Sequence, residues 1–476
     1  MKLTFWGATR QVTGSMYLLE VDDYRVLIDC GANFELDEKE KKALYDLQKS
    51  VFPFDPSLLN TVLLTHAHID HSGNIPNLYK EGFEGQVVCT EPTYSLTALL
   101  LKNAASLHQR RINTINGTAA SKKKKGKSAR ELPRDIFLEK QVNEALENFF
   151  PVAFGRRYRI SDQITVTYIP AGHLLGAAHI YLEVRENGEL KTLCFSGDIG
   201  RKNYPLLVDP QSVPQADYLI CESTYGNRLH EDTRPPEVAL ADVIQRTCVD
   251  IPGRLIIPTF SVGRTQALLY TLNRLYLTQN LPPLKVFSDS PLGFASTKVY
   301  QKYARMLNRE AREFKEEHDM LFDFENLIYV ESNDASRAIS NYSEPCIIIS
   351  SSGMIQGGRV EHHIAANIEN PYATILMIGY ASENTLGWRL LNGQDTITIG
   401  KEKKSVLANI EKIDVFSGHG DRDDLLGFVQ MQKSDQLKKI FLIHGEEQSM
   451  SQFRETLHQH GYGQVEIPER GQSFDL

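Results

Sequence analysis

Three histidines and an aspartate lie within six positions of the stretch TVLLTHAHIDHSGN, directly after an apolar run. His66, His68 and Asp70 occupy every second position, so in extended backbone their side chains share one face. His71 follows them and begins a predicted helix over 71–80. Imidazole and carboxylate ligands together are typical of zinc sites in proteins. The spacing therefore predicts that His66 and His68 bind one ion, while Asp70 and His71 point towards a second.

Six further residues of ligand type accompany other apolar runs along the chain. In each case a predicted strand leads to a histidine, aspartate or glutamate, with glycine or another small residue close by. These residues are Asp29, His173, Asp198, Glu222, His419 and His444. Any one of them alone is more often structural, but ligands at strand ends can converge on one edge of a sheet. The shared pattern therefore favours one common site.

A site of this kind is suited to chemistry at phosphorus. Two zinc ions bridged by an aspartate can hold a hydroxide, lower its pKa and neutralise the charge of a phosphorane-like transition state. A histidine outside the ligand set can protonate the leaving oxygen, provided that a carboxylate orients it. His419 and Glu222 fit that pair.

Short apolar runs rich in β-branched residues alternate with helical patterns and would position these side chains. The predicted strands are KLTFW, YRVLID, TVLLTH, QVVCT, ITVTYI, HIYLEV, TLCFS, YLICE, RLIIPTF, KVFSD, CIIIS, TILMIGY, IDVFS and KIFLIH. The predicted helices cover 93–110, 136–149, 264–279, 296–318 and 423–433. This alternation is typical of an α/β fold.

The middle of the chain, over 227–412, has a strand–helix rhythm of its own. The histidine-bearing strands resume only after it. We therefore predict an α/β domain inserted into another domain. A length of 476 residues also favours more than one hydrophobic core.

The composition is that of a soluble globular protein, with 41% hydrophobic and 24% charged residues. The N-terminus, MKLTFWGATR, reads as a strand and lacks the regions of a signal peptide, and we find no apolar run long enough for a membrane span. Six cysteines are scattered without CxxC spacing, which favours reduced, buried thiols. We expect a cytoplasmic protein with no membrane partner.

The net charge of −8 disfavours a generally basic surface for nucleic acid but allows a local basic groove. One polar, basic stretch, residues 117–134, interrupts two helical patterns and reads as an exposed insertion. Its lysine-rich part, 121–130, is either a solvated loop or a contact for a polyanion, and both interpretations remain open.

At this point a family resemblance is clear. HAHIDH, AGH, SGD and the strand-end Asp29 resemble the metallo-β-lactamase motifs, while ESTYG, FSGH and LIHGE resemble three further motifs of the β-CASP nucleases. PTFSVGRTQALL, SSSGMIQGGRVEHH and GYASENTLG resemble the inserted β-CASP domain. The similarity covers nearly the whole chain and is greatest to bacterial and archaeal relatives of the pre-mRNA 3′-end-processing endonuclease. It implies an αββα sandwich built from 1–226 and 413–476, with a β-CASP cap domain over 227–412.

The resemblance implies seven metal ligands in two sets that share one bridging aspartate. The ligands are His66, His68 and His173 for the first zinc ion, Asp70, His71 and His444 for the second, and Asp198 for both. Zinc is favoured by the number of imidazoles, although manganese could substitute.

The resemblance also implies roles in the reaction. His419 would be the general acid, Glu222 would hold it, and Asp29 would orient ligands and the nucleophilic water. The last motif contains His444 where the DNA-repair branch usually has valine, which favours RNA. The implied function is a zinc-dependent ribonuclease that cleaves single-stranded RNA by attack of a metal-held hydroxide on phosphorus. It would leave 5′-phosphate and 3′-hydroxyl ends in RNA processing or decay, as an endonuclease and, still open, as a 5′→3′ exonuclease.

Two smaller features could bind phosphate. Ser261 and Arg264 lie at a predicted helix start after a strand, and Ser351 and Ser352 follow the run CIIIS. Backbone N–H groups and a guanidinium there can receive a phosphate, but an ordinary helix cap is equally consistent. The pair His362–His363 suggests a third metal, whereas the resemblance places it outside the ligand set.

Two other classes of function remain as alternatives. A thioester, lactam or lactone hydrolase could use the same metal fold, but it does not need the long insertion or the ESTYG and FSGH motifs. An RNA-binding scaffold with a decayed site would not keep every expected ligand. A homodimer is plausible only as a default.

Overall fold

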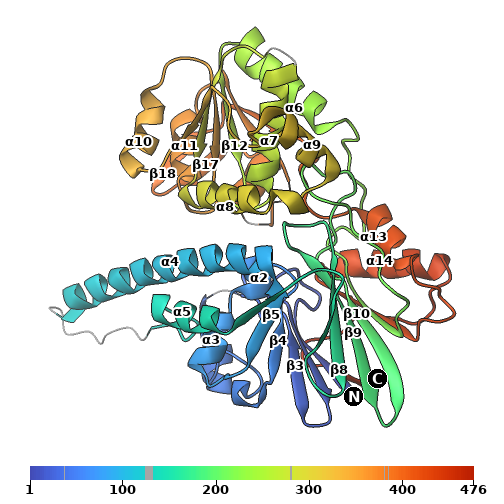
Figure 1. Cartoon of the computed structure of the whole chain (residues 1–476). Coiled ribbons are helices and arrows are strands. Elements are labelled where there is room, and N and C mark those ends of the chain that lie inside the picture. Colours follow the sequence, from blue (N-terminus) through green and yellow to red (C-terminus); the bar gives the residue numbers. More distant parts are fainter. Residues whose placement is uncertain (37, 124–131, 279–280, 380, 384) are drawn as a thin grey trace. The chain divides into compact units, whose positions relative to one another are not determined.

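The computed structural model describes residues 1–36, 38–123, 132–278, 281–379, 381–383 and 385–476 (Figure 1). The described chain divides into two compact units. Unit 1 contains Met1–Gly200, Pro210–Leu229 and His419–Leu476, and unit 2 contains Arg201–Asp209 and His230–Gly418. Each unit has its own sheet structure and its own hydrophobic core.

The first sheet of unit 1 has seven strands in the order β22–β1–β2–β3–β4–β5–β6. Their bounds are β22 (Ser473–Asp475), β1 (Lys2–Gly7), β2 (Met16–Val21), β3 (Tyr24–Ile28), β4 (Thr61–Leu63), β5 (Gln86–Thr90) and β6 (Phe149–Val152). β3 to β6 run parallel, while β1, β2 and β3 pair antiparallel. β4 is buried along its whole length, as expected for a strand inside a parallel sheet.

The second sheet of unit 1 also has seven strands, in the order β21–β20–β11–β10–β9–β8–β7. Their bounds are β21 (Val465–Glu466), β20 (Lys439–Ile443), β11 (Tyr218–Glu222), β10 (Glu189–Phe195), β9 (Ala178–Glu186), β8 (Ile164–Pro170) and β7 (Arg157–Arg159). In β8 the apolar side chains of Ile164, Val166 and Tyr168 are buried while the threonines between them are half-buried. This alternation turns one face of the sheet towards the core.

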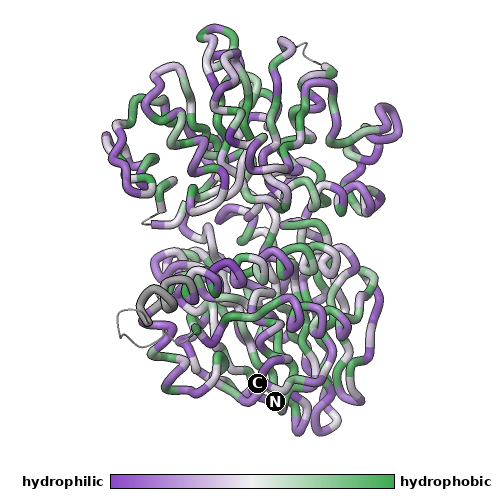
Figure 2. Tube along the Cα trace, turned by 90° about the vertical axis from the view of Figure 1, so that its left-hand side faces the viewer, coloured by the Kyte–Doolittle hydropathy of each residue, from purple (hydrophilic) through white to green (hydrophobic). Residues whose placement is uncertain are grey.

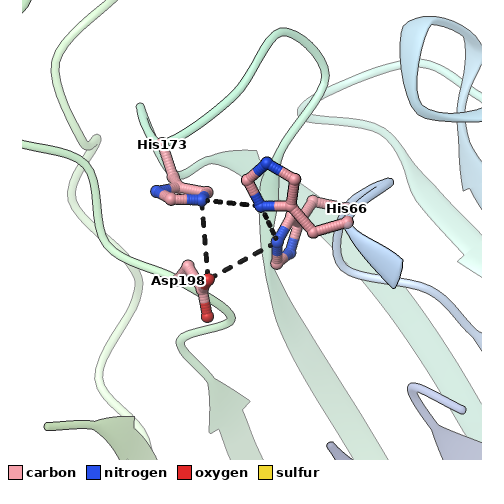
Figure 3. A group of neighbouring side chains, drawn as sticks. His66, His173 and Asp198 are labelled. Carbon is pink, nitrogen blue, oxygen red and sulfur yellow. Dashed lines mark hydrogen bonds and ion pairs between the residues drawn. The ribbon is translucent and has the colours of Figure 1, made fainter. Parts of the chain in front are cut away.

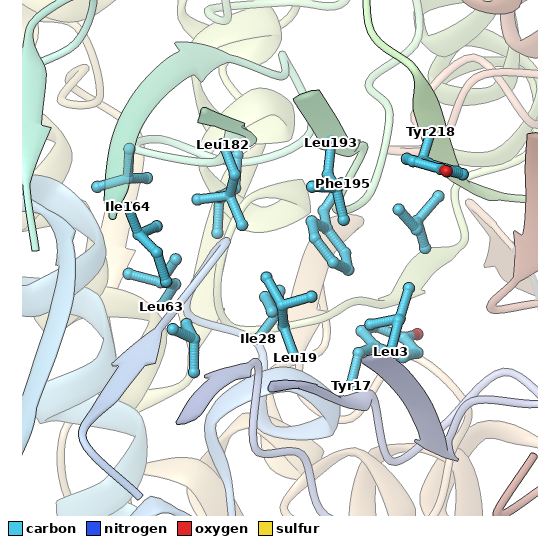
Figure 4. Close-up of a cluster of buried hydrophobic side chains, with 14 of the residues drawn as sticks. Leu3, Tyr17, Leu19, Ile28, Leu63, Ile164, Leu182, Leu193, Phe195 and Tyr218 are labelled. Carbon is cyan, nitrogen blue, oxygen red and sulfur yellow. The ribbon is translucent and has the colours of Figure 1, made fainter. Parts of the chain in front are cut away.

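The two sheets of unit 1 pack face to face over one apolar cluster (Figure 4). The labelled members from the first sheet are Leu3, Tyr17, Leu19, Ile28 and Leu63, and those from the second are Ile164, Leu182, Leu193, Phe195 and Tyr218. The rings of Tyr17 and Phe195 stack across the interface with centroids 6.2 Å apart. The interface therefore resembles the core of a β-sandwich.

Helices cover the outer faces of both sheets. α1 (Glu38–Gln48), α3 (Ile75–Lys80) and α5 (Glu139–Glu147) contribute to the core on the first sheet. α13 (Arg422–Val429) and α14 (Glu447–Gln459) do so on the second. The layers are thus α, β, β and α, which confirms the predicted sandwich.

Unit 2 is built on a parallel sheet of six strands in the order β14–β13–β15–β12–β16–β19. The strands are β14 (Leu327–Tyr329), β13 (Lys285–Asp289), β15 (Cys346–Ser350), β12 (Arg254–Pro258), β16 (Ala373–Met377) and β19 (Asn409–Lys412). The helices are α6 (Pro236–Ile244), α7 (Arg264–Thr278), α8 (Pro291–Lys302), α9 (Arg309–His318), α10 (Asn333–Ala338), α11 (Val360–Asn367) and α12 (Leu386–Leu391). Parallel strands need such helical crossovers.

In each unit, hydrophilic segments gather at the periphery of the trace (Figure 2).

The remaining elements are short, apart from α4. They are α2 (Ile69–Ser72), α4 (Glu91–Lys123), β17 (Thr396–Ile399), β18 (Glu402–Ser405), and the single turns η1 (Pro56–Leu58), η2 (Gln245–Asp250), η3 (Ala304–Met306) and η4 (Ile339–Asn341). Across the described ranges, no helix combines the length and the apolar character that a membrane span requires. All six cysteines are buried free thiols, as predicted.

One predicted strand is wrong. IDVFS forms a turn, in which the N–H of Ser417 donates to the carbonyl of Asp414. The Asp414 carboxylate accepts hydrogen bonds from the N–H groups of Glu231 and Asp232. Its apolar neighbours are buried without joining a sheet, so burial and not strand pairing explains the apolar run. Every other predicted strand overlaps an observed one.

Two predicted helices and the predicted insertion also differ from the structure. The pattern over 296–318 is two helices, because Asn308 caps α9 by accepting from the N–H of Ala311. The helix predicted over 71–80 begins at Ile69 and is divided into α2 and α3. The insertion predicted over 117–134 is helical as far as Lys123, since α4 continues through it. Its residues 124–131 lie outside the described part of the chain.

Candidate metal centre

The predicted site residues of unit 1 converge because neighbouring strands end at the same edge. The parallel register aligns Ile28 with Leu63 in β3 and β4, and Glu222 with Ile443 in β11 and β20. Directly after these strands the backbone turns sharply. Asp29 and His444 have φ values of 58° and 50°, in the left-handed region. These turns direct both side chains to the centre.

The first group contains His66, His68, His173 and Asp198 (Figure 3). His68 Nδ1 lies 3.1 Å from His66 Nε2 and 3.1 Å from His173 Nε2. The same two Nε2 atoms each lie 3.5 Å from Asp198 Oδ2. Four candidate ligand atoms therefore surround one point, and they come from three separate segments of the chain.

The second group contains Asp70, His71 and His444. The Nε2 atoms of the two histidines are 3.2 Å apart, and His444 Nε2 lies 3.6 Å from Asp70 Oδ2. Asp198 Oδ1 lies 3.2 Å from His71 Nε2. Asp198 thus turns one carboxylate oxygen towards each group.

The donor set fits zinc. Zinc–nitrogen bonds of about 2.0–2.1 Å place neighbouring ligand atoms roughly 3.3–3.4 Å apart at the corners of a tetrahedron. The separations in both groups, from 3.1 to 3.6 Å, bracket that value. Asp198 Oδ1 is buried, and among the described residues it accepts no well-directed hydrogen bond. A buried carboxylate oxygen in this position is suited to a metal ion.

The ionisation of the groups follows from burial and from the carboxylates. Burial lowers the pKa of His66 well below its ordinary value and that of His68 to about 4, so both rings are neutral, as metal binding requires. Burial also opposes charge on His71, but Asp198 and Asp29 outweigh it and raise the pKa of His71. Burial raises the pKa of Asp198, but the neighbouring imidazoles outweigh it and lower that pKa well below its ordinary value.

Asp29 holds candidate ligands on the side that faces away from the centre. Its carboxylate accepts hydrogen bonds from the N–H and the Oγ1 of Thr65, at 2.8 Å and 2.8 Å. His71 Nδ1 is 2.7 Å from Asp29 Oδ2, which leaves the Nε2 of that ring facing the centre. Thr65 Oγ1 also lies 3.1 Å from His66 Nδ1. Sequence reasoning did not single out Thr65, although it directly precedes His66.

His419 and Glu222 form the predicted pair. His419 Nδ1 lies 3.2 Å from Glu222 Oε1, and His419 Nε2 lies 3.9 Å from Asp198 Oδ2. Glu222 is fully buried and accepts hydrogen bonds from the N–H groups of Ile199 and Thr224. The carboxylate therefore holds one side of the imidazole while the other side faces the centre.

Thr224 is a second residue that sequence reasoning missed. Its Oγ1 lies 3.0 Å from His444 Nδ1 and donates to the His444 carbonyl at 3.1 Å. The signal was available, because Thr224 belongs to the ESTYG motif two positions after Glu222. The motif therefore contacts both His419 and His444.

The four predicted phosphate-binding residues lie in unit 2. Ser261 and Ser351 meet with their Oγ atoms 2.7 Å apart, and Ser290, which was not predicted, lies 2.7 Å from Ser351 Oγ. Arg264 begins α7 and its guanidinium lies 4.7 Å from the centre of the Phe260 ring. Ser352 does not join this cluster of serine hydroxyls. Its Oγ donates to the Gln356 carbonyl and accepts from the Gln356 N–H.

The His362–His363 pair belongs to neither ligand group among the described residues. His363 is buried and its Nε2 lies 2.6 Å from Asp289 Oδ2. His362 Nε2 lies 3.0 Å from Ser340 Oγ. The geometry favours a structural role for the pair.

Three family models match the chain. They are the metallo-β-lactamase superfamily over residues 9–241, the β-CASP domain over 265–390, and the Zn-dependent metallo-hydrolase RNA specificity domain over 403–468. A solved structure described as a protein of unknown function from Enterococcus faecalis V583 has a similar fold. Its TM-score is 0.55 at 13% identity, over 100% of this chain and 99% of that one.

Sequence similarity to curated relatives extends over most of the chain. Ribonuclease TTHA0252 of Thermus thermophilus is 30% identical over 450 residues, covering 94% of each chain. An RNase J-like protein of Methanocaldococcus jannaschii is 30% identical, over 96% of this chain and 95% of its own. Transcription termination factor FttA of the same organism is 32% identical, over 98% of this chain and 70% of its own. These matches confirm the resemblance found in the motifs, and the chain belongs to the β-CASP family of metallo-β-lactamase-fold metallo-hydrolases.

Proposed function

We propose that this protein is a zinc-dependent ribonuclease that hydrolyses single-stranded RNA in RNA processing or decay. The observation that carries the proposal is the pair of His419 and Glu222 beside the ligand groups, with His419 Nε2 turned towards Asp198. A metal-dependent hydrolase that only needs an activated water has no use for such a pair. The names of the ribonuclease relatives support RNA as the substrate.

The proposed ligand sets follow the two groups of side chains. His66, His68 and His173 would hold one zinc ion, Asp70, His71 and His444 would hold the other, and Asp198 would bridge them. Two bound zinc ions supply a nucleophilic water at neutral pH and neutralise charge on the phosphate. Asp29 would orient His71 and, through Thr65, His66.

The protein's own residues supply the proton for the leaving group. His419 would donate a proton from Nε2 to the 3′-oxygen that leaves, while Glu222 stabilises the imidazolium through Nδ1. Because water is the nucleophile and not the ribose 2′-hydroxyl, the products would carry a 5′-phosphate and a 3′-hydroxyl. Endonuclease cleavage is the primary proposal, and 5′→3′ exonuclease cleavage is an additional one.

Four residues of unit 2 would bind RNA phosphates. The hydroxyls of Ser261 and Ser351 meet at the carboxyl edge of a parallel sheet, which supports this role. Arg264 supports it as well, because it is the first residue of α7 and carries a guanidinium. The fourth, Ser352, would contribute from the neighbouring loop. Ser290 shares the hydroxyl cluster and extends the set.

The test uses matched single-stranded RNA and DNA, labelled at the 3′ end, with zinc-loaded protein. We expect cleavage of RNA, little cleavage of DNA, and none by Asp70→Ala. Internal fragments would indicate an endonuclease, and loss of mononucleotides from the 5′ end an exonuclease. Cleavage of DNA alone, or of neither nucleic acid, would refute the proposal.

A substitution of His419 tests the general acid. We expect His419→Ala to lower the kcat on RNA by roughly 100- to 10,000-fold, because proton transfer to the leaving oxygen is lost. His458→Ala is the matched control, since His458 is exposed near the end of α14. An unchanged kcat for His419→Ala would show that the assignment is wrong.

The alternative activity, hydrolysis of a thioester or lactone, is not favoured. That activity requires neither the β-CASP domain, which the chain matches over 265–390, nor the His419–Glu222 pair. Turnover of thioesters without any nuclease activity would revive it. A cytoplasmic location and a homodimer remain predictions, and light scattering of the purified protein would test the latter.

A further inference from the structure

Arg228 lies one aromatic ring away from the proposed general acid. The ring of Tyr225 packs edge-on against His419 with centroids 6.0 Å apart, and the Arg228 guanidinium lies 4.2 Å from the centre of the Tyr225 ring. Tyr225 is buried, whereas Arg228 is exposed. The Arg422 N–H donates to the Arg228 carbonyl at 3.0 Å and fixes this turn of the backbone. All four residues belong to unit 1.

The contact with Tyr225 positions a group that is suited to phosphate. A cation over a ring face is attracted by the ring, and the five N–H donors of a guanidinium lie in its plane. Those donors match the oxygens of a phosphate, which an arginine can bind with two parallel hydrogen bonds. Tyr225 therefore orders a side chain that would otherwise lose much rotamer freedom on binding.

The charges around the centre make a cation at this position useful. The protein has a net charge of −8, and the ligand groups and their supports include four acidic residues, Asp29, Asp70, Asp198 and Glu222. A polyanion that approaches His419 thus requires local cations beyond the metal ions.

We propose that Arg228 binds an RNA phosphate that neighbours the one being cleaved, with Tyr225 holding the guanidinium in place. This inference rests on the proposed function and names a further residue that determines the substrate. It makes the enzyme favour a strand with several phosphates over an isolated phosphodiester. Arg228 is a substrate-positioning residue and takes no part in proton transfer.

The experiment compares two substrates of the zinc-loaded protein. One is a single-stranded RNA oligonucleotide, and the other is bis(4-nitrophenyl) phosphate, which has a single phosphate. We expect Arg228→Gln to lower the ratio of the two kcat/KM values, RNA over the small ester, about tenfold, as for a lost charged hydrogen bond. Arg228→Lys should recover part of the ratio. Arg159→Gln is the control, because exposed Arg159 lies where β7 pairs with the beginning of β8.

A binding measurement separates this role from a structural one. In His419→Ala protein, which should bind RNA without cutting it, we expect Arg228→Gln to reduce the slope of log Kd against log salt by about 0.7. A fall in activity on both substrates to the same extent, with an unchanged slope, would mean that Arg228 only supports Tyr225 and would overturn the inference. If the unsubstituted protein neither binds nor cuts RNA, the proposed function itself fails.

Discussion

Three of the proposed ligand histidines are held by a partner on the side that faces away from the centre. His66 Nδ1 meets the hydroxyl of Thr65 at 3.1 Å, and His71 Nδ1 meets Asp29 at 2.7 Å. His444 Nδ1 meets the hydroxyl of Thr224 at 3.0 Å. Such partners select the ring tautomer that leaves Nε2 available for a metal. Each supporting residue should therefore affect metal affinity, which can be measured.

Thr224→Val should weaken metal binding. The valine keeps the shape of the side chain but cannot hold His444, and loss of such a partner typically lowers metal affinity about 10- to 100-fold. Competition of the protein with a zinc chelator would measure the affinity. Thr224→Ser keeps the hydroxyl and is the control. Equal affinities for the valine and serine variants would show that the hydroxyl does not orient His444.

Among the elements, the turn at Asp414 joins segments of unit 2 that are far apart in the sequence. Its carbonyl accepts a hydrogen bond from Arg201, and its carboxylate accepts from the N–H groups of Glu231 and Asp232. Burial raises the pKa of Asp414, but the hydrogen bonds from His230 and from these N–H groups outweigh it and lower that pKa to about 2. The turn therefore depends on an ionised carboxylate.

Asp414→Asn should destabilise unit 2 at neutral pH. A carboxylate with a lowered pKa stabilises the fold above the ordinary aspartate value of about 4, and this stabilisation is lost as the pH falls through about 2. We expect the free energy of unfolding to fall by on the order of 2 kcal/mol at pH 7 and by less in acid. Urea unfolding from pH 7 to pH 3 would measure both, with exposed Asp435→Asn as control. A constant difference across that range would contradict the assignment.

At the scale of the whole molecule, the proposed metal ligands all belong to unit 1. Unit 2 has a separate sheet and a separate apolar core. Metal binding is coupled to folding only for the part of the chain that contains the ligands. The two units should consequently respond differently to loss of metal.

Removal of zinc should lower the melting temperature of unit 1 but not that of unit 2. A ligand present at about 1,000 times its Kd stabilises the folded state by about 4 kcal/mol, and chelation removes this contribution. Scanning calorimetry with and without a chelator would measure the effect, and added zinc should restore it. An unchanged melt would show that zinc does not stabilise the fold.

The sequence by itself determined the residue types of the proposed ligands, their order and the strand that precedes each segment that carries them. HAHIDH and the strand-end residues indicated a shared metal site because ligand chemistry and strand periodicity are local properties. The family motifs extended this to the αββα sandwich and the β-CASP insertion. The same local patterns misjudged IDVFS, since a buried turn and a buried strand have the same apolar composition.

Only the tertiary structure decided which side chains meet. Thr224 and His444 are 220 positions apart in the sequence, and the ring of Tyr225 lies against both Arg228 and His419. The two oxygens of Asp198 face different ligand groups because four strand ends are aligned in space. Distances of this kind depend on sheet register and on packing between layers, which no local pattern of residues contains.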